Sequence, residues 1–204
     1  MFAALTGLGL STAAGLNAYI PLLVVGLVAH FTDAVRLPQG YEWLSNGWVL
    51  LIVAVLLVAE IVLDKVPVVD HVNDIIQTAV RPASGGVVFS ATAAAAELDN
   101  SAWMAEHPAV GWILGIAVAL VVHAVKASAR PVVNVTTAGV GAPVVSTVED
   151  AGALGMSLIA IFLPVLVVVA VAVLVFVGWR LLRRVRRHRA ARRSRTAERL
   201  KPPA

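Results

Sequence analysis

Polar side chains that could bind a ligand recur at helical spacing in two segments of an otherwise apolar chain. In the first segment the spacings are four, three and four residues, which on a helix place all members on one face. These members are Asp70, Asp74, Gln77 and Arg81. The second segment carries Lys126, Arg130 and Asn134 at spacings of four. Ionisable groups in apolar surroundings need partners or water, so we expect both segments to line one polar cavity.

The residue types in these segments favour binding of a small polar or anionic solute. Guanidinium and ammonium groups pair with carboxylate and phosphate, so the three bases of the two segments would hold the anion. The carboxylates of Asp70, Asp74 and Asp150 would position these bases or carry a coupling cation or proton. A lipid phosphate head group is one candidate anion. We therefore expect a transporter or a channel-like protein.

A metal site is an alternative for the same region. Asp70, His71 and Asp74 are helical neighbours that offer two carboxylates and an imidazole, which are common metal ligands. The spacing is not that of a His-Glu-x-x-His motif, so further ligands would have to come from elsewhere, for example Glu60, Asp64, Glu149 or Asp150. His71 is otherwise a hydrogen-bonded interior or interfacial histidine. An intramembrane enzyme acting on a lipid through this Asp/His cluster is the corresponding alternative function.

Composition excludes several other classes. The chain of 204 residues is 59% hydrophobic and 14% charged and has no cysteine, which excludes disulfides, thiolate nucleophiles and Cys-ligated metals. No Walker loop, nucleophile elbow or dinucleotide fingerprint is present, so no cofactor is implied and an enzyme is less favoured. Residues 1–179 carry five Lys/Arg against eleven Asp/Glu, whereas residues 180–204 carry eleven against one. Without a nucleic-acid-binding motif, this basic tail does not indicate nucleic acid as a partner.

A mean hydropathy of +0.87 predicts an all-α, polytopic membrane protein. We expect about five transmembrane helices and two broken or re-entrant segments. The expected spans are a bent helix over 5–29, a helix over 48–63, a third span ending near 96, and helices over 111–125 and 157–179. We expect the first span to stay in the mature protein rather than to be cleaved as a signal peptide, because no Lys or Arg precedes Arg36. The broken segments would be 67–82 and 130–145, where prolines interrupt the chain. Residues 1–179 would form this transmembrane domain.

The two halves of the chain share a weak internal similarity. Trp48 and Trp112 are 64 residues apart, and so are the tetrapeptides that begin at Pro67 and Pro131. We interpret residues 48–97 and 112–165 as a duplicated unit of helix, broken segment and helix. Chance is the alternative, because Val is abundant and few positions match.

The basic tail, residues 180–204, predicts the orientation of the chain. Its first sixteen residues contain nine arginines: Arg180, Arg183, Arg184, Arg186, Arg187, Arg189, Arg192, Arg193 and Arg195. Such density indicates a cytoplasmic, largely disordered tail that contacts anionic lipids of a bacterial inner membrane. If both broken segments return to the side they entered from, the N-terminus lies outside and residues 97–107 inside; if each crosses, the two units become inverted repeats.

Shorter motifs have structural interpretations. Ser146 and Glu149 fit a capping box at a helix start. Gly111 and Gly115 fit a small-residue face for helix packing. His123 and Lys126 share a helical turn, and we expect Lys126 to reach an acid of the first half or the membrane interface.

Several of these runs together resemble a bacterial integral-membrane family known as domain of unknown function 4126. They are 15–21 (GLNAYIP), 64–74 (DKVPVVDHVND), 81–83 (RPA), 126–131 (KASARP), Asn134, and Ser146 with Glu149 and Asp150. The resemblance covers about residues 10–165. It implies a multi-pass membrane protein but brings no assigned activity and no catalytic residues. A third interpretation, a non-catalytic assembly subunit or homo-oligomer held by buried polar contacts, therefore stays open.

Overall fold

The computed structural model describes residues 2–64, 67–95, 107–137, 140–177, 179–180 and 183, and within them every regular element is a helix. The fold is all-α, as predicted. The helices are α1 (Phe2–Leu16), α2 (Tyr19–Phe31), α3 (Gly47–Leu63), α4 (Pro67–Ala95), α6 (Pro108–Thr136) and α7 (Gly141–Phe162), with a short 3-10 helix η1 (Glu42–Ser45). A further apolar helix covers Leu166–Val177.

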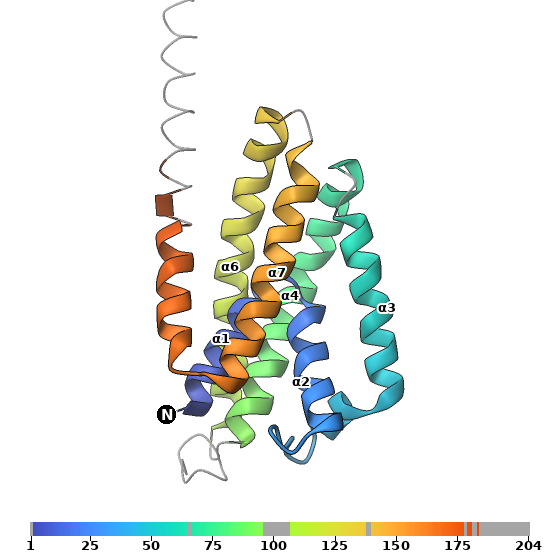
Figure 1. Ribbon diagram of the computed structural model, residues 1–204, viewed down its shortest axis with the longest axis vertical. Helices are drawn as coiled ribbons and strands as arrows, with labels where there is room; N and C mark the ends of the chain where they lie inside the picture. Colours follow the sequence, from blue (N-terminus) through green and yellow to red (C-terminus); the bar gives the residue numbers. More distant parts are fainter. Residues whose placement is uncertain are drawn as a thin grey trace, which may run out of the picture.

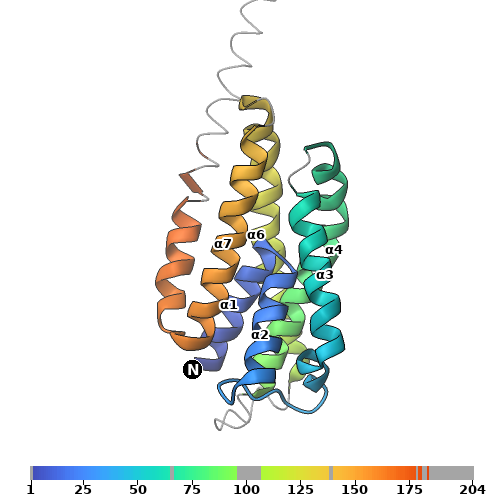
Figure 2. The ribbon, with the colours of Figure 1, turned by 45° about the vertical axis from the view of Figure 1, so that its right-hand side comes forward.

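The apolar N-terminal run forms two half-length helices rather than the single bent span that we expected. The chain leaves the helix at Asn17 and Ala18, between α1 and α2. In both ribbon views α1 rises from the N-terminal end to about the middle of the bundle, and α2 returns to the end where α1 began (Figures 1 and 2). We call this pair the α1–α2 hairpin. The hairpin begins and ends at the same end of the bundle, in a part of the chain where we expected a crossing.

Helices α4 and α6 run without interruption through the prolines at which we expected breaks. Pro82 and Pro131 both lie inside 29-residue helices. An interior proline removes one backbone hydrogen bond and strains one turn, but tight packing of the two helices offsets this. A Cβ atom on Gly115 would lie 2.2 Å from the carbonyl oxygen of Gly85, so the two backbones touch directly. The glycine pattern at Gly111 and Gly115 therefore contributes one such contact, through Gly115.

The C-terminal part also differs from the expected spans. Helix α7 begins at Gly141, so Ser146 lies inside it and the predicted capping box at Ser146 is wrong. The helix ends at Phe162, and the chain turns before Leu166. Pro164 in this turn explains why 157–179 is not one continuous span, since proline cannot continue a helix at low cost. In contrast, α3 over Gly47–Leu63 agrees closely with the predicted span 48–63.

Two ends of the bundle can be distinguished. The N-terminus, the connection from α2 to α3, the end of α4 and the start of α6 lie at one end, which we call the N-terminal end (Figures 1 and 2). The junctions from α3 to α4 and from α6 to α7 lie at the opposite end, which we call the far end. The ends of α4 and α6 that flank residues 97–107 therefore lie at the same end of the bundle as the N-terminus. Of the two arrangements that the sequence left open, this disagrees with the one in which both broken segments return to the side they entered from. This follows because α3 and α4 both run the length of the bundle.

Helix α1 occupies the centre of the packing. Its Leu10, Ala13 and Ala14 are at most 1% exposed. A Cβ atom on Gly15 would lie 2.5 Å from Val122 Cβ, so α1 approaches α6 as closely as small residues allow. The end of α1 is thereby held against the helices that carry the polar side chains.

Candidate functional site

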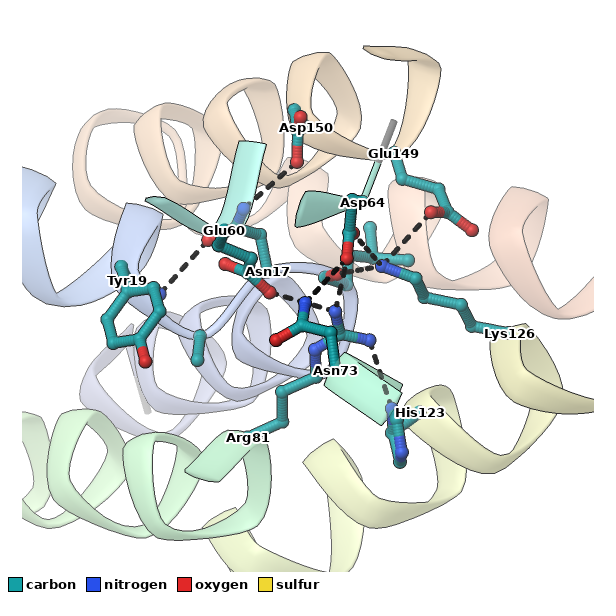
Figure 3. Close-up of polar contacts among 12 residues, drawn as sticks. Asn17, Tyr19, Glu60, Asp64, Asn73, Arg81, His123, Lys126, Glu149 and Asp150 are labelled. Carbon is teal, nitrogen blue, oxygen red and sulfur yellow. Dashed lines mark hydrogen bonds and ion pairs between the residues drawn. The ribbon is translucent and has the colours of Figure 1, made fainter. Parts of the chain in front are cut away.

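Six ionised side chains meet where α1 ends. They come from the last turn of α3 with the residue after it, from the middle of α4, from α6 and from α7 (Figure 3). We call this group the ionic cluster: Glu60, Asp64, Arg81, Lys126, Arg130 and Glu149. Spacings of four place Glu60 and Asp64 on one helical face and Lys126 and Arg130 on another. Helix α4 packs against both α3 and α6, and Asp64 reaches the two bases of α6.

Arg81 forms the inner part of the cluster. Its Nη2 donates to Glu60 Oε1 at 2.8 Å and lies 3.8 Å from Asp64 Oδ2. The side chain of Arg81 is fully buried, and the side chain of Glu60 is 1% exposed. A charge so far from water needs a partner of opposite sign at this distance, and Glu60 provides it.

His123 continues this arrangement on α6. Arg81 Nη1 lies 3.0 Å from Nδ1 of His123, and Thr78 Oγ1 lies 3.1 Å from its Nε2. Because a guanidinium group only donates, Nδ1 must accept the hydrogen bond. His123 is therefore neutral, with its proton on Nε2, where it is donated to the Thr78 hydroxyl.

Lys126 and Arg130 hold two carboxylates between them. Lys126 Nζ lies 3.0 Å from Glu149 Oε2 and 3.6 Å from Asp64 Oδ2. Arg130 Nη2 donates to the same two oxygen atoms, at 2.9 Å and 2.8 Å. Asn73 Nδ2 donates to the second oxygen of Asp64 at 2.7 Å. Two bases thus converge on two carboxylate oxygens, which is the geometry of an anion site.

The break in the α1–α2 hairpin adjoins this site. Lys126 Nζ donates to the Leu16 carbonyl oxygen at 2.8 Å, and Ser84 Oγ donates to the Ala18 carbonyl oxygen at 2.6 Å. Asn17 Oδ1 accepts from the backbone N–H groups that begin α2, at 3.0 and 3.1 Å, while its Nδ2 donates to Asp150 Oδ1 at 2.9 Å. Side chains therefore satisfy the helix ends that the break exposes.

Among the described side chains, the ionic cluster has three acids and three bases, so these charges balance. Their side chains are 0–2% exposed in four cases, 7% for Arg130 and 14% for Glu149. Burial of a balanced and hydrogen-bonded set costs far less than burial of one unpaired ion. Such a set is nevertheless a poor way to stabilise a protein, because apolar side chains of similar volume would serve as well.

The structure brings some of the predicted site residues together and leaves others apart. Arg81, Lys126 and Arg130 meet in the ionic cluster, and Gln77 is buried one turn before Arg81. Asp150 accepts a hydrogen bond from Asn17 at the break of the hairpin. The side chains of Asp70, His71, Asp74 and Asn134 lie outside the described residues, and so does the predicted metal site. The two halves of the chain do meet, and among the described side chains Asp64 is the acid of the first half that contacts the α6 bases.

From the sequence we expected other roles for the acids of the cluster. Glu60, Asp64 and Glu149 were candidates for further ligands of a metal, and Glu149 also fitted a capping box. Among the described residues, no three or more His, Asp or Glu side chains are grouped as metal ligands. The available signal was that Glu60 and Asp64 stand one turn apart at the end of an apolar helix, a position that requires basic partners.

These features define a helical bundle in which a hairpin of two half-length helices turns beside a buried ionic cluster. The chain belongs to the family described as domain of unknown function (DUF4126), whose family model matches residues 4–184. No curated protein and no solved structure matches the chain.

Proposed function

We propose that the protein is an integral membrane protein that binds a small anion at Lys126 and Arg130 and passes it across the bilayer. Two of its helices, over Ala109–Pro131 and Gly141–Phe162, are long and apolar enough to cross a membrane. The outer face of α3 supports the same placement, since Val55 and Val58 are each 61% exposed. Apolar side chains with that exposure suit a lipid environment rather than water.

Aromatic residues mark the ends of the bundle. Trp43, Trp48 and Trp112 are 46%, 75% and 36% exposed at the N-terminal end, where Trp112 Nε1 donates to the Tyr41 hydroxyl at 3.1 Å. Trp179 follows the last helix. Tryptophan and tyrosine concentrate at membrane interfaces, so these residues support a bilayer that covers the length between them.

The arginines give the orientation that we propose. Arg180 and Arg183 follow the last helix, and Arg183 Cζ lies 4.0 Å from the ring centre of Trp179. The remaining tail arginines lie outside the described residues. By the positive-inside rule the tail is cytoplasmic, which places the far end inside and the N-terminal end outside. The tail would then rest on anionic lipids of the bacterial inner membrane.

One observation carries the proposal of an anion site. Glu149 Oε2 accepts from both Lys126 and Arg130, at 3.0 and 2.9 Å. A carboxylate of the protein thus occupies the place that a carboxylate or phosphate oxygen of a solute would take. Glu149 is the most exposed member of the cluster, at 14%, so it is the side chain that can leave toward water. An incoming anion would displace Glu149 and keep the charge of the cluster balanced.

The α1–α2 hairpin would change its packing when the anion binds. Lys126 contacts Glu149 and the last carbonyl of α1 with the same nitrogen atom. An anion that draws this ammonium group toward itself weakens its bond to Leu16 and so loosens the hairpin. Discontinuous helices that end at a central ion or solute site are a recurring device of membrane transporters.

Binding of inorganic phosphate and acetate to the purified protein in lipid nanodiscs tests the proposal. We expect at least one to bind, and Arg130→Gln to weaken binding by ~10-fold or more through loss of a charge-assisted hydrogen bond. Glu149→Gln should tighten binding because it removes the internal competitor. Arg180→Gln, at the far end, is the matched control and should bind as the wild type does.

Uptake of the anion that binds, measured in liposomes, then tests passage across the bilayer. Loss of uptake in Arg130→Gln with retained uptake in Arg180→Gln is the expected result. If neither the wild type nor Glu149→Gln binds either anion, while both remain folded, the ionic cluster is an assembly element and the proposed function is wrong.

A further inference from the structure

A cavity lies at the N-terminal end, away from the ionic cluster. Its volume is about 240 Å³, and it lies between α1, α2, the segment that follows α2, α4 and the turn after α7. Its walls are largely apolar and include Leu10, Val25, Ala91 and Ile161. Thr6, also in the wall, lies near the start of α1, whereas the ionic cluster lies beside its last residue. The two sites therefore do not share wall residues.

Arg36 is one of the residues that line this cavity. It is the only Lys or Arg between the N-terminus and residue 64. The residue is exposed, and within the described ranges it makes no ion pair and no hydrogen bond. An unpaired guanidinium group at the mouth of an apolar cavity complements a ligand with an apolar body and a negative end.

The size of the cavity restricts the ligand further. Pockets for compact organic ligands usually measure roughly 300–1,000 Å³, so about 240 Å³ accommodates a narrow chain better than a whole compact ligand. A small hydrophilic anion does not fit either, since apolar walls would desolvate it without replacing its hydrogen bonds. A flexible hydrocarbon chain gains from burial at every methylene group.

We infer that this cavity binds an anionic membrane lipid, with part of one acyl chain inside the cavity and the head group on Arg36. The bilayer around the N-terminal end supplies such a lipid at high local concentration. The acyl chain enters between α1 and the segment that follows α2, and the head-group phosphate pairs with the guanidinium group at the membrane surface. The lipid then fills the space beside α1 and holds the first half of the hairpin in place.

Thermal unfolding of the full-length protein in detergent, with added lipid, tests this inference. A ligand that only the folded state binds raises Tm. We expect phosphatidylglycerol to raise Tm by several degrees, phosphatidylcholine with the same acyl chains to raise it less, and glycerol phosphate to have no effect. Arg36→Gln should abolish the difference between the two lipids. Gln39→Ala changes an exposed residue of the same connection that does not line the cavity, and it should leave that difference unchanged.

A second variant tests the acyl-chain part separately. Ala34→Trp fills the cavity from its exposed rim, where the larger side chain disturbs the helices least, and we expect it to lower the effect of both lipids. Labelling by a lipid with a photoreactive group on its acyl chain should reach the residues 3–10 peptide, and Ala34→Trp should reduce it. Equal stabilisation by both lipids in the wild type, or labelling unaffected by Ala34→Trp, would overturn the inference. Stabilisation by glycerol phosphate equal to that by phosphatidylglycerol would also overturn it.

Discussion

The side-chain nitrogen of Lys126 lies 2.8 Å from the carbonyl oxygen of Leu16, the last residue of α1. The same nitrogen lies 3.0 Å from Glu149 Oε2. One ammonium group therefore caps a half-length helix and takes part in the anion site that we propose. A positive charge at a helix C-terminus is stabilising in itself. A movement of this nitrogen atom at the proposed anion site would therefore also change its hydrogen bond to the end of α1.

Lys126→Met should destabilise the protein by about 3–5 kcal/mol, because it leaves buried carboxylates short of one base and a helix end without its donor. Lys126→Arg keeps the charge and should cost much less. The free energy of unfolding, measured with denaturant in detergent, distinguishes the two variants. Equal stability of Lys126→Met and wild type would mean that the ammonium group is not paired in the folded protein.

The hydrogen bond between Asn17 and Asp150 can be tested by exchanging the two residue types between the two positions. Asn17→Asp still caps α2, but it loses the donor to Asp150 Oδ1 and sets two carboxylates against each other. We expect a cost of about 1–3 kcal/mol for this single change. Adding Asp150→Asn restores a donor and an acceptor, and should recover most of the loss. The thermal midpoints of both variants give the measurement, and additive losses in the double variant would argue against a direct bond.

Two glycines offer a matched test of helix packing. A Cβ atom on Gly115 would lie 2.2 Å from the Gly85 carbonyl oxygen, whereas a Cβ atom on Gly155 would meet nothing within 4 Å. Gly115→Ala should therefore cost about 1–3 kcal/mol through overpacking. Gly155→Ala should be neutral or stabilise α7 by up to about 1 kcal/mol, through helix propensity. Comparable losses in both would show that α4 and α6 are not in contact at Gly115.

The absence of cysteine makes the arrangement of the ends directly measurable. Single cysteines at Gln39 and His107 should react with a membrane-impermeant maleimide from the same side, because both positions lie at the N-terminal end. A cysteine at Val140, which is 77% exposed at the far end, should react from the other side. Reaction of Gln39→Cys and His107→Cys from opposite sides would contradict the arrangement in which α3 and α4 both run the length of the bundle.

Composition and periodicity were enough to predict the all-helical class and the position of α3. Spacing also indicated that Arg81, Lys126 and Arg130 require partners. The identity of those partners was not readable, because Asp64 contacts Arg130 across 66 positions of sequence. A contact of that kind depends on how α3, α4 and α6 pack, which no local pattern specifies.

The helix breaks show a second limit of local patterns. Prolines suggested interruptions at Pro82 and Pro131, yet both are accommodated inside long helices. The hairpin breaks at Asn17 instead, whose side chain replaces the backbone bonds lost there. Pro21 stands in the first turn of α2, where no intrahelical donor is needed. The informative signal was thus an amide side chain placed just before a proline, rather than the proline alone.

The contacts that hold the α1–α2 hairpin have a consequence for the order in which the protein assembles. Asn17 is bonded to Asp150, 133 positions further on, and Leu16 to Lys126, 110 positions further on. When the hairpin leaves the ribosome, neither of these partners has been translated yet. In the membrane placement that we propose, unpaired polar groups are costly in lipid, so the hairpin would wait at the bilayer surface or beside the insertion machinery until α6 and α7 have entered. The hairpin would then be translated before its partners and reach its final position after them.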